Sequence, residues 1–472
     1  MIWKGIKTPI SMFVYSTALP IIFPALISAF ATTTTNTNMI PKLRGVVFDM
    51  DDTLVLANLD IPEMYKKVFG KDPLNREDFD ILKEIKALEC PEEQARAHRI
   101  IEEMEEESRQ QMTLMPGCVE LLTWLSAHNI PTALVTRNTR KTTHMFSERL
   151  QAIQQEKGRR GHGDLDLSFQ KIIARDDMGS DNTPIPPKPD PAAMKIIARE
   201  SFDIKNEKDL PFPEILMVGD NVANDVGFGK NAGACTALLA SDEKYADAAD
   251  IFVEKLTELP RKIWNHFEID GSLGNTPEAN QLPLHGSPPP TPQSKLCKAV
   301  VDNDVATVRT MLGDLSLDEI TAADEENKNT ALIWAAEIGN LELTRLILDT
   351  VVAKLSEDEN YRKEERLLSF VNHRGFLGAT ALNRAARRGH THIVDSLLSP
   401  KDCEVASCFD ADVPNDKLQH PLHFAAFKKH PETVASLLQC GANPWVLDRK
   451  GRTPLEDTSC ETCQSLLKKA ML

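Results

Sequence analysis

The sequence predicts an α/β domain built on a parallel sheet, followed by a helical repeat region in the C-terminal third. Three apolar runs, at residues 45–48, 130–135 and 215–219, each stop at a polar residue. Continuous apolar runs of this kind are typical of parallel strands that are buried on both faces. Near the C-terminus, the segment 330–336 recurs as 380–386, which indicates stacked repeats rather than a second sheet.

The first apolar run ends at a cluster of carboxylates. Asp49 and Asp51 follow Phe48 directly, with Met50 between them. In open α/β sheets the ligand lies at the carboxyl ends of the strands. Because the chain turns there, one residue can offer its side chain and the other its carbonyl oxygen. Hard divalent cations prefer such oxygen ligands, so the sequence predicts a metal-dependent site at this end of the strand.

Polar residues also follow the later segments. The apolar run 130–135 leads to Thr136, and the Pro-rich loop 186–191 presents Lys188. The run 215–219 leads to Asp220, with Asp225 five residues further on. Together these positions supply carboxylates, a hydroxyl and an ammonium group. That combination suits phosphoryl transfer, in which a carboxylate attacks phosphorus while cations neutralise the phosphate.

These motifs resemble those of the haloacid dehalogenase superfamily, in its phosphatase branch, over residues 43–259. Asp49 through Leu54 matches the first motif, and Thr136 and Lys188 match the second and third. Gly219 with Asp220 and Asp225 matches the fourth. The resemblance implies a doubly wound parallel sheet with a Rossmann-like strand order.

The resemblance also implies catalytic roles. Asp49 is expected to attack the phosphate and form an aspartyl-phosphate, and Asp51 to protonate the leaving oxygen and then activate water. Thr136 and Lys188 are expected to hold the phosphoryl oxygens. The dehalogenases of the family lack the second Asp, so Asp51 argues against dehalogenation.

The same resemblance implies Mg²⁺ as the cofactor. Its expected ligands are the Asp49 carboxylate, the Asp51 carbonyl and Asp220, with Asp225 supporting the shell directly or through water. Asp52 stands where many members of the family carry Gly. Asp tolerates unusual turn geometry better than most residues, so we expect this substitution to be accommodated.

Residues between the first and second motifs show no strand pattern. Segments 77–88 and 92–112 have helical periodicity. This insertion, at about 57–114, resembles the helical cap of the phosphoglycolate-phosphatase-like subfamily. The acidic run 102–107 is expected to be a solvent-exposed face, and Tyr65, Lys66, Lys67 and Arg76 are candidate substrate contacts. Further on, residues 154–163 are expected to form an exposed loop, and residues 250–253 the last strand of the domain.

Composition limits the class of partner. The net charge of −16 argues against nucleic acid, because phosphate backbones require clustered Lys and Arg. Nine cysteines are scattered without the spacing of a four-ligand zinc site, and this pattern suits a reducing compartment.

The first 38 residues predict a targeting leader. Lys4 and Lys7 precede the apolar stretch 18–27, and Ala29-Phe30-Ala31 resembles a signal-peptide cleavage site. With the Thr-rich tract that follows, the segment resembles the two-part plastid-targeting leader of algae with secondary plastids. The expected location is a plastid or other organelle, with no stable membrane insertion of the mature chain. The alternative is a start at Met39, which would give a cytoplasmic protein.

The hydrolase domain is predicted over residues 39–265 and the repeat region over residues 294–472. Residues 266–293, between them, are rich in Pro and Gly and predict an extended, mobile linker. Such a linker predicts two domains that fold and act independently.

The repeat region resembles a stack of about five ankyrin repeats, an all-α solenoid. Segment 330–336 aligns with 380–386 and 420–426, partly with 453–455, and again with 296–300. Gly339 and Gly389 fall where the repeat turns between its helices, and His423 is read as part of the turn packing. The concave face of such a stack usually binds protein, so the repeats predict a protein partner.

The sequence therefore predicts a Mg²⁺-dependent phosphatase of a small phosphorylated metabolite, tethered to an ankyrin interaction module. One alternative is a non-catalytic ankyrin scaffold with a silent phosphatase-like domain. Another is a phosphotransferase or mutase of sugar phosphates, which would use the same residues.

Overall fold

The computed structural model describes residues 40–56, 61–71, 81–204, 210–269, 291–357, 362–398 and 406–472. Residues Ile40–Leu472 form one compact unit. The predicted leader, residues 1–38, lies outside the described residues, and so do positions 270–290 of the predicted linker. In the part of the chain that the structure describes, every helix is too short or too polar to cross a membrane.

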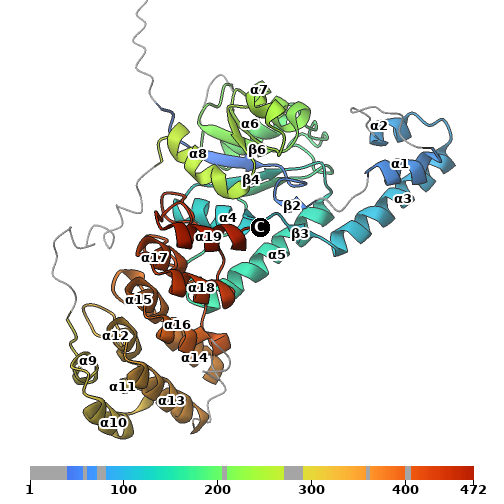
Figure 1. The fold of residues 1–472 in the computed structure, drawn as a ribbon. Coiled ribbons are helices and arrows are strands. Elements are labelled where there is room, and N and C mark those ends of the chain that lie inside the picture. Colours follow the sequence, from blue (N-terminus) through green and yellow to red (C-terminus); the bar gives the residue numbers. More distant parts are fainter. Residues whose placement is uncertain are drawn as a thin grey trace, which may run out of the picture. The chain divides into compact units, whose positions relative to one another are not determined.

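A six-stranded parallel sheet forms the centre of the N-terminal domain (Figure 1). Its strands lie in the order β5 Lys171–Ile173, β4 Thr132–Val135, β1 Gly45–Phe48, β6 Ile215–Gly219, β7 Cys235–Leu239 and β8 Ile251–Val253. All neighbours pair in parallel. From the central strand β1 the chain runs outward through β4 and β5, and then returns to β6 and runs through β7 and β8. The prediction of a doubly wound, Rossmann-like sheet is confirmed.

Helices cover both faces of this sheet. On one face Val46 and Phe48 pack with α4 Cys118–Ala127, α5 Arg140–Arg159 and α8 Leu259–His266. On the other face Val47 packs with α6 Ala192–Glu200 and α7 Gly227–Asn231. Successive side chains of a strand point to opposite faces, so a run that is apolar throughout must be covered on both.

The prediction of an exposed loop over residues 154–163 was wrong for its first half. Helix α5 continues to Arg159, because Gln154, Gln155, Glu156 and Lys157 are all good helix formers. The Gly-rich composition of this stretch hid that continuation.

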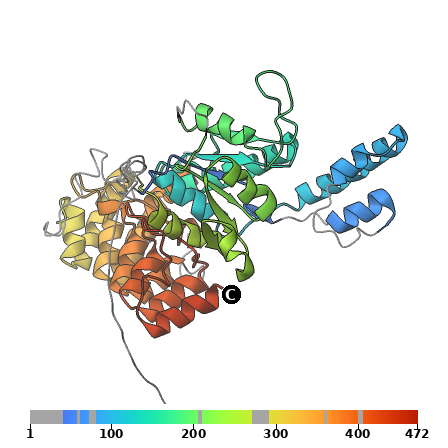
Figure 2. The same ribbon diagram turned by 90° about the horizontal axis from the view of Figure 1, so that it is seen from above.

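Three helices form the predicted cap: α1 Ile61–Phe69, α2 Ile81–Lys86 and α3 Pro91–Gln110. They share a small apolar core of Met64, Val68, Ile85, Ala97 and Ile101, and both views show α1 beside α3 (Figure 2). The antiparallel strands β2 Val55–Leu56 and β3 Thr113–Leu114 join the cap to the sheet domain. The cap therefore has a core of its own and a two-stranded stem.

The acidic run on α3 is not simply a solvent-exposed face. Glu105 pairs with Arg175 at 3.2 Å, and Glu106 pairs with Lys141 at 2.6 Å. Helical periodicity identifies a polar face of a helix but not the groups that pack against it. Here part of the acidic face of α3 lies against cations of the sheet domain.

The C-terminal part is all-α, as predicted. Its helices are α9 Lys295–Val301, α10 Val305–Asp314, α11 Leu317–Thr321, α12 Ala331–Ile338, α13 Leu341–Glu357, α14 Lys363–Val371, α15 Ala381–Arg388, α16 Thr391–Leu398, α17 Pro421–Phe427, α18 Pro431–Gln439 and α19 Glu461–Ala470. Figure 2 shows successive helix pairs stacked side by side.

The repeat motif fixes the ends of these helices. The Thr330 and Thr380 hydroxyls accept hydrogen bonds from the third residue of α12 and α15. Gly339 and Gly389 end the same helices with φ of +77° and +74°, a conformation that glycine adopts without strain. The segment 453–455 forms turns rather than a helix, so the last unit contributes the single helix α19.

The two domains are in direct contact, which the linker did not lead us to expect. Leu447, in a repeat loop, is 4% exposed and belongs to the core of the sheet domain. The Trp124 indole Nε1 on α4 donates to the Arg449 carbonyl at 3.2 Å, and Asn443 Nδ2 donates to Glu120 Oε1 at 2.7 Å. Loops lack the periodicity by which a sequence shows a buried face, so this interface was not predictable.

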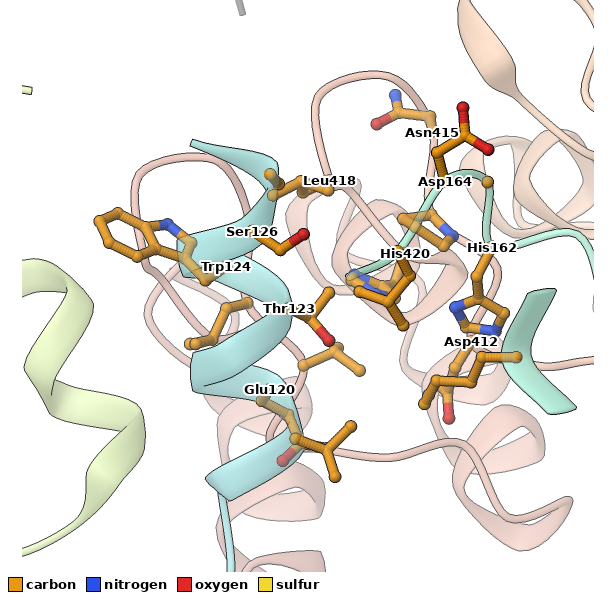
Figure 3. Close-up of a pocket in the computed structure, with 18 of the residues that line it drawn as sticks. Glu120, Thr123, Trp124, Ser126, His162, Asp164, Asp412, Asn415, Leu418 and His420 are labelled. Atoms are coloured by element: carbon orange, nitrogen blue, oxygen red, sulfur yellow. The ribbon is translucent and has the colours of Figure 1, made fainter. Parts of the chain in front are cut away.

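A cavity of about 540 Å³ remains within that interface (Figure 3). It lies between α4 and the repeat loop that carries Asp412, Asn415 and His420. His162 closes one side and pairs with Asp410 of the repeats at 3.0 Å. None of the six predicted site residues lines this cavity, so it is separate from the predicted chemistry.

Candidate active site

The site lies at the carboxyl edge of the three central strands. Asp49 follows β1, Thr136 follows β4 and Asp220 follows β6, and these strands are direct neighbours. Parallel strands bring their carboxyl ends to the same edge, and the switch point of the sheet lies here, where the winding reverses. The strand order thus gathers residues that are far apart in the sequence.

Lys188 connects two of the carboxylates. Its Nζ donates hydrogen bonds to Asp49 Oδ1 and, at 2.6 Å, to Asp225 Oδ1. The Lys188 and Asp225 side chains are each 2% exposed and that of Asp49 is 12% exposed. Three predicted site residues therefore form one buried charged cluster.

A short π-helical turn, η1 Val222–Val226, places Asp225 in this cluster. The Asn221 backbone N–H donates to Asp225 Oδ2 at 3.0 Å, which fixes the second oxygen. A Cβ atom at Gly219 would lie 2.3 Å from the Asp225 Cβ, so no larger residue fits at that position. Packing therefore explains why the fourth motif has glycine at this position: its lack of a side chain lets Asp225 lie close to the end of the strand.

Asp49, Asp220 and Asp225 form a possible metal-ligand group. Each can place one carboxylate oxygen within 4.8 Å of the others. Carboxylate oxygens are the ligands that Mg²⁺ prefers. The donor set fits a hard divalent cation.

The charge balance of the site also fits a cation. Burial, together with repulsion from Asp225, raises the pKa of Asp49 to about 7 against the opposing effect of Lys188. Burial, followed by repulsion from Asp225 and Asp49, raises the pKa of Asp220 to about 7. Three carboxylates share one ammonium group, so the site is short of positive charge.

Asp51 has a partner that the sequence did not predict. Asn138 Nδ2 lies 2.9 Å from both carboxylate oxygens of Asp51. The Asn138 backbone N–H also donates to Thr136 Oγ1 at 3.1 Å. Asn138 thus links the second motif to the first, and its only signal in the sequence is its place two residues after Thr136.

The turn behind the first strand has the geometry that was expected of it. Asp52 adopts φ of +50°, in the left-handed region where glycine is common. Asp is among the few other residues that occupy this region readily, so the family's usual glycine can be replaced here.

Of the candidate substrate contacts on the cap, Tyr65 faces inward. Its hydroxyl donates to Glu84 Oε2 at 2.8 Å within the cap, and the residue is 6% exposed. Tyr65 therefore supports the cap rather than presenting a contact at its surface. Arg76 lies outside the described residues.

Comparison with known proteins agrees with this architecture. The family model for haloacid dehalogenase-like hydrolases matches residues 43–233, and the model for ankyrin repeats in three copies matches residues 296–408 and 362–448. A haloacid dehalogenase-like hydrolase domain-containing protein of Arabidopsis thaliana is 29% identical over 248 residues, which cover 50% of this chain and 89% of that protein. An uncharacterized hydrolase of Saccharomyces cerevisiae is 28% identical over 229 residues, which cover 47% of this chain and 92% of that protein.

The two family models match different parts of the structure. The hydrolase model matches the parallel-sheet domain with its carboxylates, and the ankyrin model matches the helical stack. The chain therefore carries a haloacid dehalogenase-like hydrolase domain, followed by ankyrin repeats.

Proposed function

We propose that the hydrolase domain is a Mg²⁺-dependent phosphatase that acts on a small phosphorylated metabolite through an aspartyl-phosphate. The observation that carries this proposal is the contact of Lys188 with both Asp49 and Asp225 inside a cluster of carboxylates. Such a site attracts a dianionic phosphate only when positive charge offsets the carboxylates. Bound to Asp49, Asp220 and Asp225, Mg²⁺ would supply that charge and polarise the phosphoryl group.

In the first step an Asp49 carboxylate oxygen attacks phosphorus, and the bond from phosphorus to the leaving oxygen breaks. Asp51, oriented by Asn138, gives its proton to that oxygen. Lys188, and Thr136 at the neighbouring strand end, would hold the phosphoryl oxygens.

In the second step Asp51 takes a proton from water, whose oxygen attacks phosphorus. The bond to Asp49 breaks, and inorganic phosphate and the free carboxylate are restored.

The ankyrin repeats support a second, non-catalytic role for the same chain. We propose that they bind a protein partner, because stacked repeats offer an extended surface for that purpose.

The test of the phosphatase is the Asp49→Asn variant, assayed on a panel of phosphomonoesters with and without Mg²⁺. It keeps the shape of the side chain and removes the nucleophile, so turnover should fall by more than about a thousandfold. Excess EDTA should abolish wild-type activity, and added Mg²⁺ should restore it. The exposed carboxylate Asp247 offers a matched control as Asp247→Asn, which should keep wild-type rates.

Wild-type activity in Asp49→Asn would contradict the proposed mechanism. Wild-type protein that hydrolyses none of the panel, although folded and loaded with Mg²⁺, would favour the scaffold alternative. Transfer of the phosphoryl group to an added sugar in preference to water would favour the phosphotransferase.

A further inference from the structure

A cavity extends from the carboxylate edge of the sheet to the ankyrin repeats. It has a volume of about 750 Å³, and its lining includes Asp52 and Asp220. Its lining also includes Trp445, from a repeat loop, and Met471, after the last helix. The cavity is therefore shared by the two domains and opens next to a proposed metal ligand.

This cavity has room for the part of a substrate that lies beyond the phosphate. Beside Asp51, a second cavity lined by Glu105, Arg109 and Asn138 holds only about 30 Å³, close to the volume of one water molecule. Pockets for small organic ligands measure roughly 300–1,000 Å³. A bulky leaving group thus has space along Asp52, toward the repeats, in the larger cavity.

Aromatic and apolar groups also line the larger cavity. Tyr245, on the 3-10 turn η2 Glu243–Ala248, belongs to the hydrolase domain and is 41% exposed. Trp445 reaches in from the repeats, and its ring lies 4.5 Å from the Lys255 Nζ. Other apolar lining residues are Met115, Pro116 and Leu239.

The segment that carries Trp445 is held by the interface between the domains. Its backbone N–H donates to Asn443 Oδ1 at 2.9 Å, and Asn443 in turn donates to Glu120 on α4. Two residues beyond Trp445, Leu447 is buried in the core of the hydrolase domain. An anchored aromatic ring loses little conformational freedom when a ligand stacks on it, which favours binding.

The charges in the cavity select against a second anionic group. Four acidic side chains line it, those of Asp52, Asp220, Asp242 and Glu254. The single ammonium group of the lining, that of Lys255, lies over the Trp445 ring. A neutral aromatic group suits this lining better than a carboxylate or a second phosphate would.

We propose that Trp445 and Tyr245 form a specificity subsite for the leaving group of the substrate, a flat, uncharged aromatic ring carried on a phosphate monoester. This inference rests on the proposed phosphatase function, since the cavity is read as the continuation of that active site. It makes Trp445, a residue of the ankyrin repeats, a determinant of substrate choice in the hydrolase domain.

The test measures binding of non-hydrolysable phosphonates to the full chain with Mg²⁺, by calorimetry. Phenylphosphonate should bind about tenfold more tightly than methylphosphonate, because only the former reaches the aromatic subsite. Trp445→Ala and Tyr245→Ala should each reduce that preference, with the methylphosphonate Kd unchanged. Trp445→Phe should keep most of it.

Trp264 provides the matched control. It is 43% exposed on α8, lies edge-on to His128, and does not line the cavity. Trp264→Ala should leave both phosphonate affinities unchanged.

Four results would overturn the subsite. These are equal affinity of the wild type for the two phosphonates, equal weakening of both by Trp445→Ala, tighter binding of phosphonoacetate than of phenylphosphonate, and no binding of phenylphosphonate. Failure of the wild type to hydrolyse any phosphomonoester would overturn the phosphatase instead, and the phosphonate ratio would still decide the subsite.

Discussion

Lys188 Nζ donates to Asp225 Oδ1 at 2.6 Å, and both side chains are 98% buried. The two residues come from different segments, the Pro-rich loop before α6 and the π-helical turn after β6. Removing one member of a buried ion pair leaves the other charge uncompensated, which costs about 3–5 kcal/mol in typical cases. The stability of the folded site therefore depends on the presence of both charged side chains.

Replacing Lys188 by Met should remove the ammonium group while nearly keeping the shape of the side chain. Activity should fall at least about a hundredfold, because the phosphate loses a fixed cation. The thermal midpoint should also fall without Mg²⁺, and added Mg²⁺ should recover part of that loss, since it replaces the missing charge. Lys262→Met, an exposed position on α8, should behave as wild type in both measurements. A Lys188→Met enzyme with normal kcat/KM would show that the ammonium group has no part in the reaction.

Asn138→Ala should leave Asp51 without its amide donor. Burial raises the pKa of Asp51, and the Asn138 hydrogen bond lowers it. Loss of that bond should raise the Asp51 pKa further, so the basic limb of the kcat profile should move to higher pH. The rate should fall about tenfold or more, since the general acid is less well oriented. The pH–rate profile measures this shift. If the rate fell equally at every pH and the basic limb stayed at the same pH, the role of Asn138 would be purely structural.

Asp412 should make stability depend on pH. Burial, followed by repulsion from Asp410, raises the pKa of Asp412 to about 7, although both of its oxygens accept from the Asn443 backbone N–H at 3.1 Å. A folded-state pKa above the unfolded value gives a contribution that is complete below about pH 4 and is lost as the pH rises through 7. Asp412→Asn cannot lose a proton, so its stability relative to the wild type should increase as the pH rises, by at most about 4 kcal/mol by pH 8.

Thermal unfolding from pH 5 to pH 8 would measure this difference. Asp302→Asn, at an exposed position of the repeats, is the control and should follow the wild-type curve. Parallel curves for Asp412→Asn and the wild type would exclude a buried, titrating Asp412.

Leu447→Ala should destabilise the hydrolase domain although the residue belongs to the repeats. The side chain is 4% exposed in the hydrolase core, and truncation of such a leucine costs about 2–5 kcal/mol. Denaturation followed by a probe in the hydrolase domain should show the loss. Phe427→Ala, 55% exposed on α17, should not. An unchanged hydrolase transition in Leu447→Ala would mean that the two domains unfold separately.

The sequence was most informative where buried strands end at polar residues. The runs 45–48, 132–135 and 215–219 are apolar because helices cover both faces of the sheet, and this is visible without a structure. Strand β5 was missed because it begins at Lys171 and has only two apolar residues, too few for a pattern. Strand β7 begins at Cys235 and ends without a catalytic polar residue, so it did not stand out.

Other contacts depend on neighbours that the local sequence does not encode. Asn138 is an ordinary amide until the fold brings Asp51 within 2.9 Å. The docking of the repeats rests on irregular loops around Asn443, Leu447 and Arg449, where no periodicity separates a buried side from an exposed one.

The way the repeats touch the hydrolase changes how the stack should come apart. In a free solenoid each repeat contacts only its neighbours, so fraying can start at either end and spread. Here the loops before α15, before α17 and before α19 all contact the hydrolase domain, through residues such as Asn372, Asp410 and Arg449. These non-covalent contacts attach the C-terminal end of the stack to the hydrolase domain. Local opening should therefore concentrate in α9 and α10, so that hydrogen-exchange protection rises along the stack toward its C-terminal repeats.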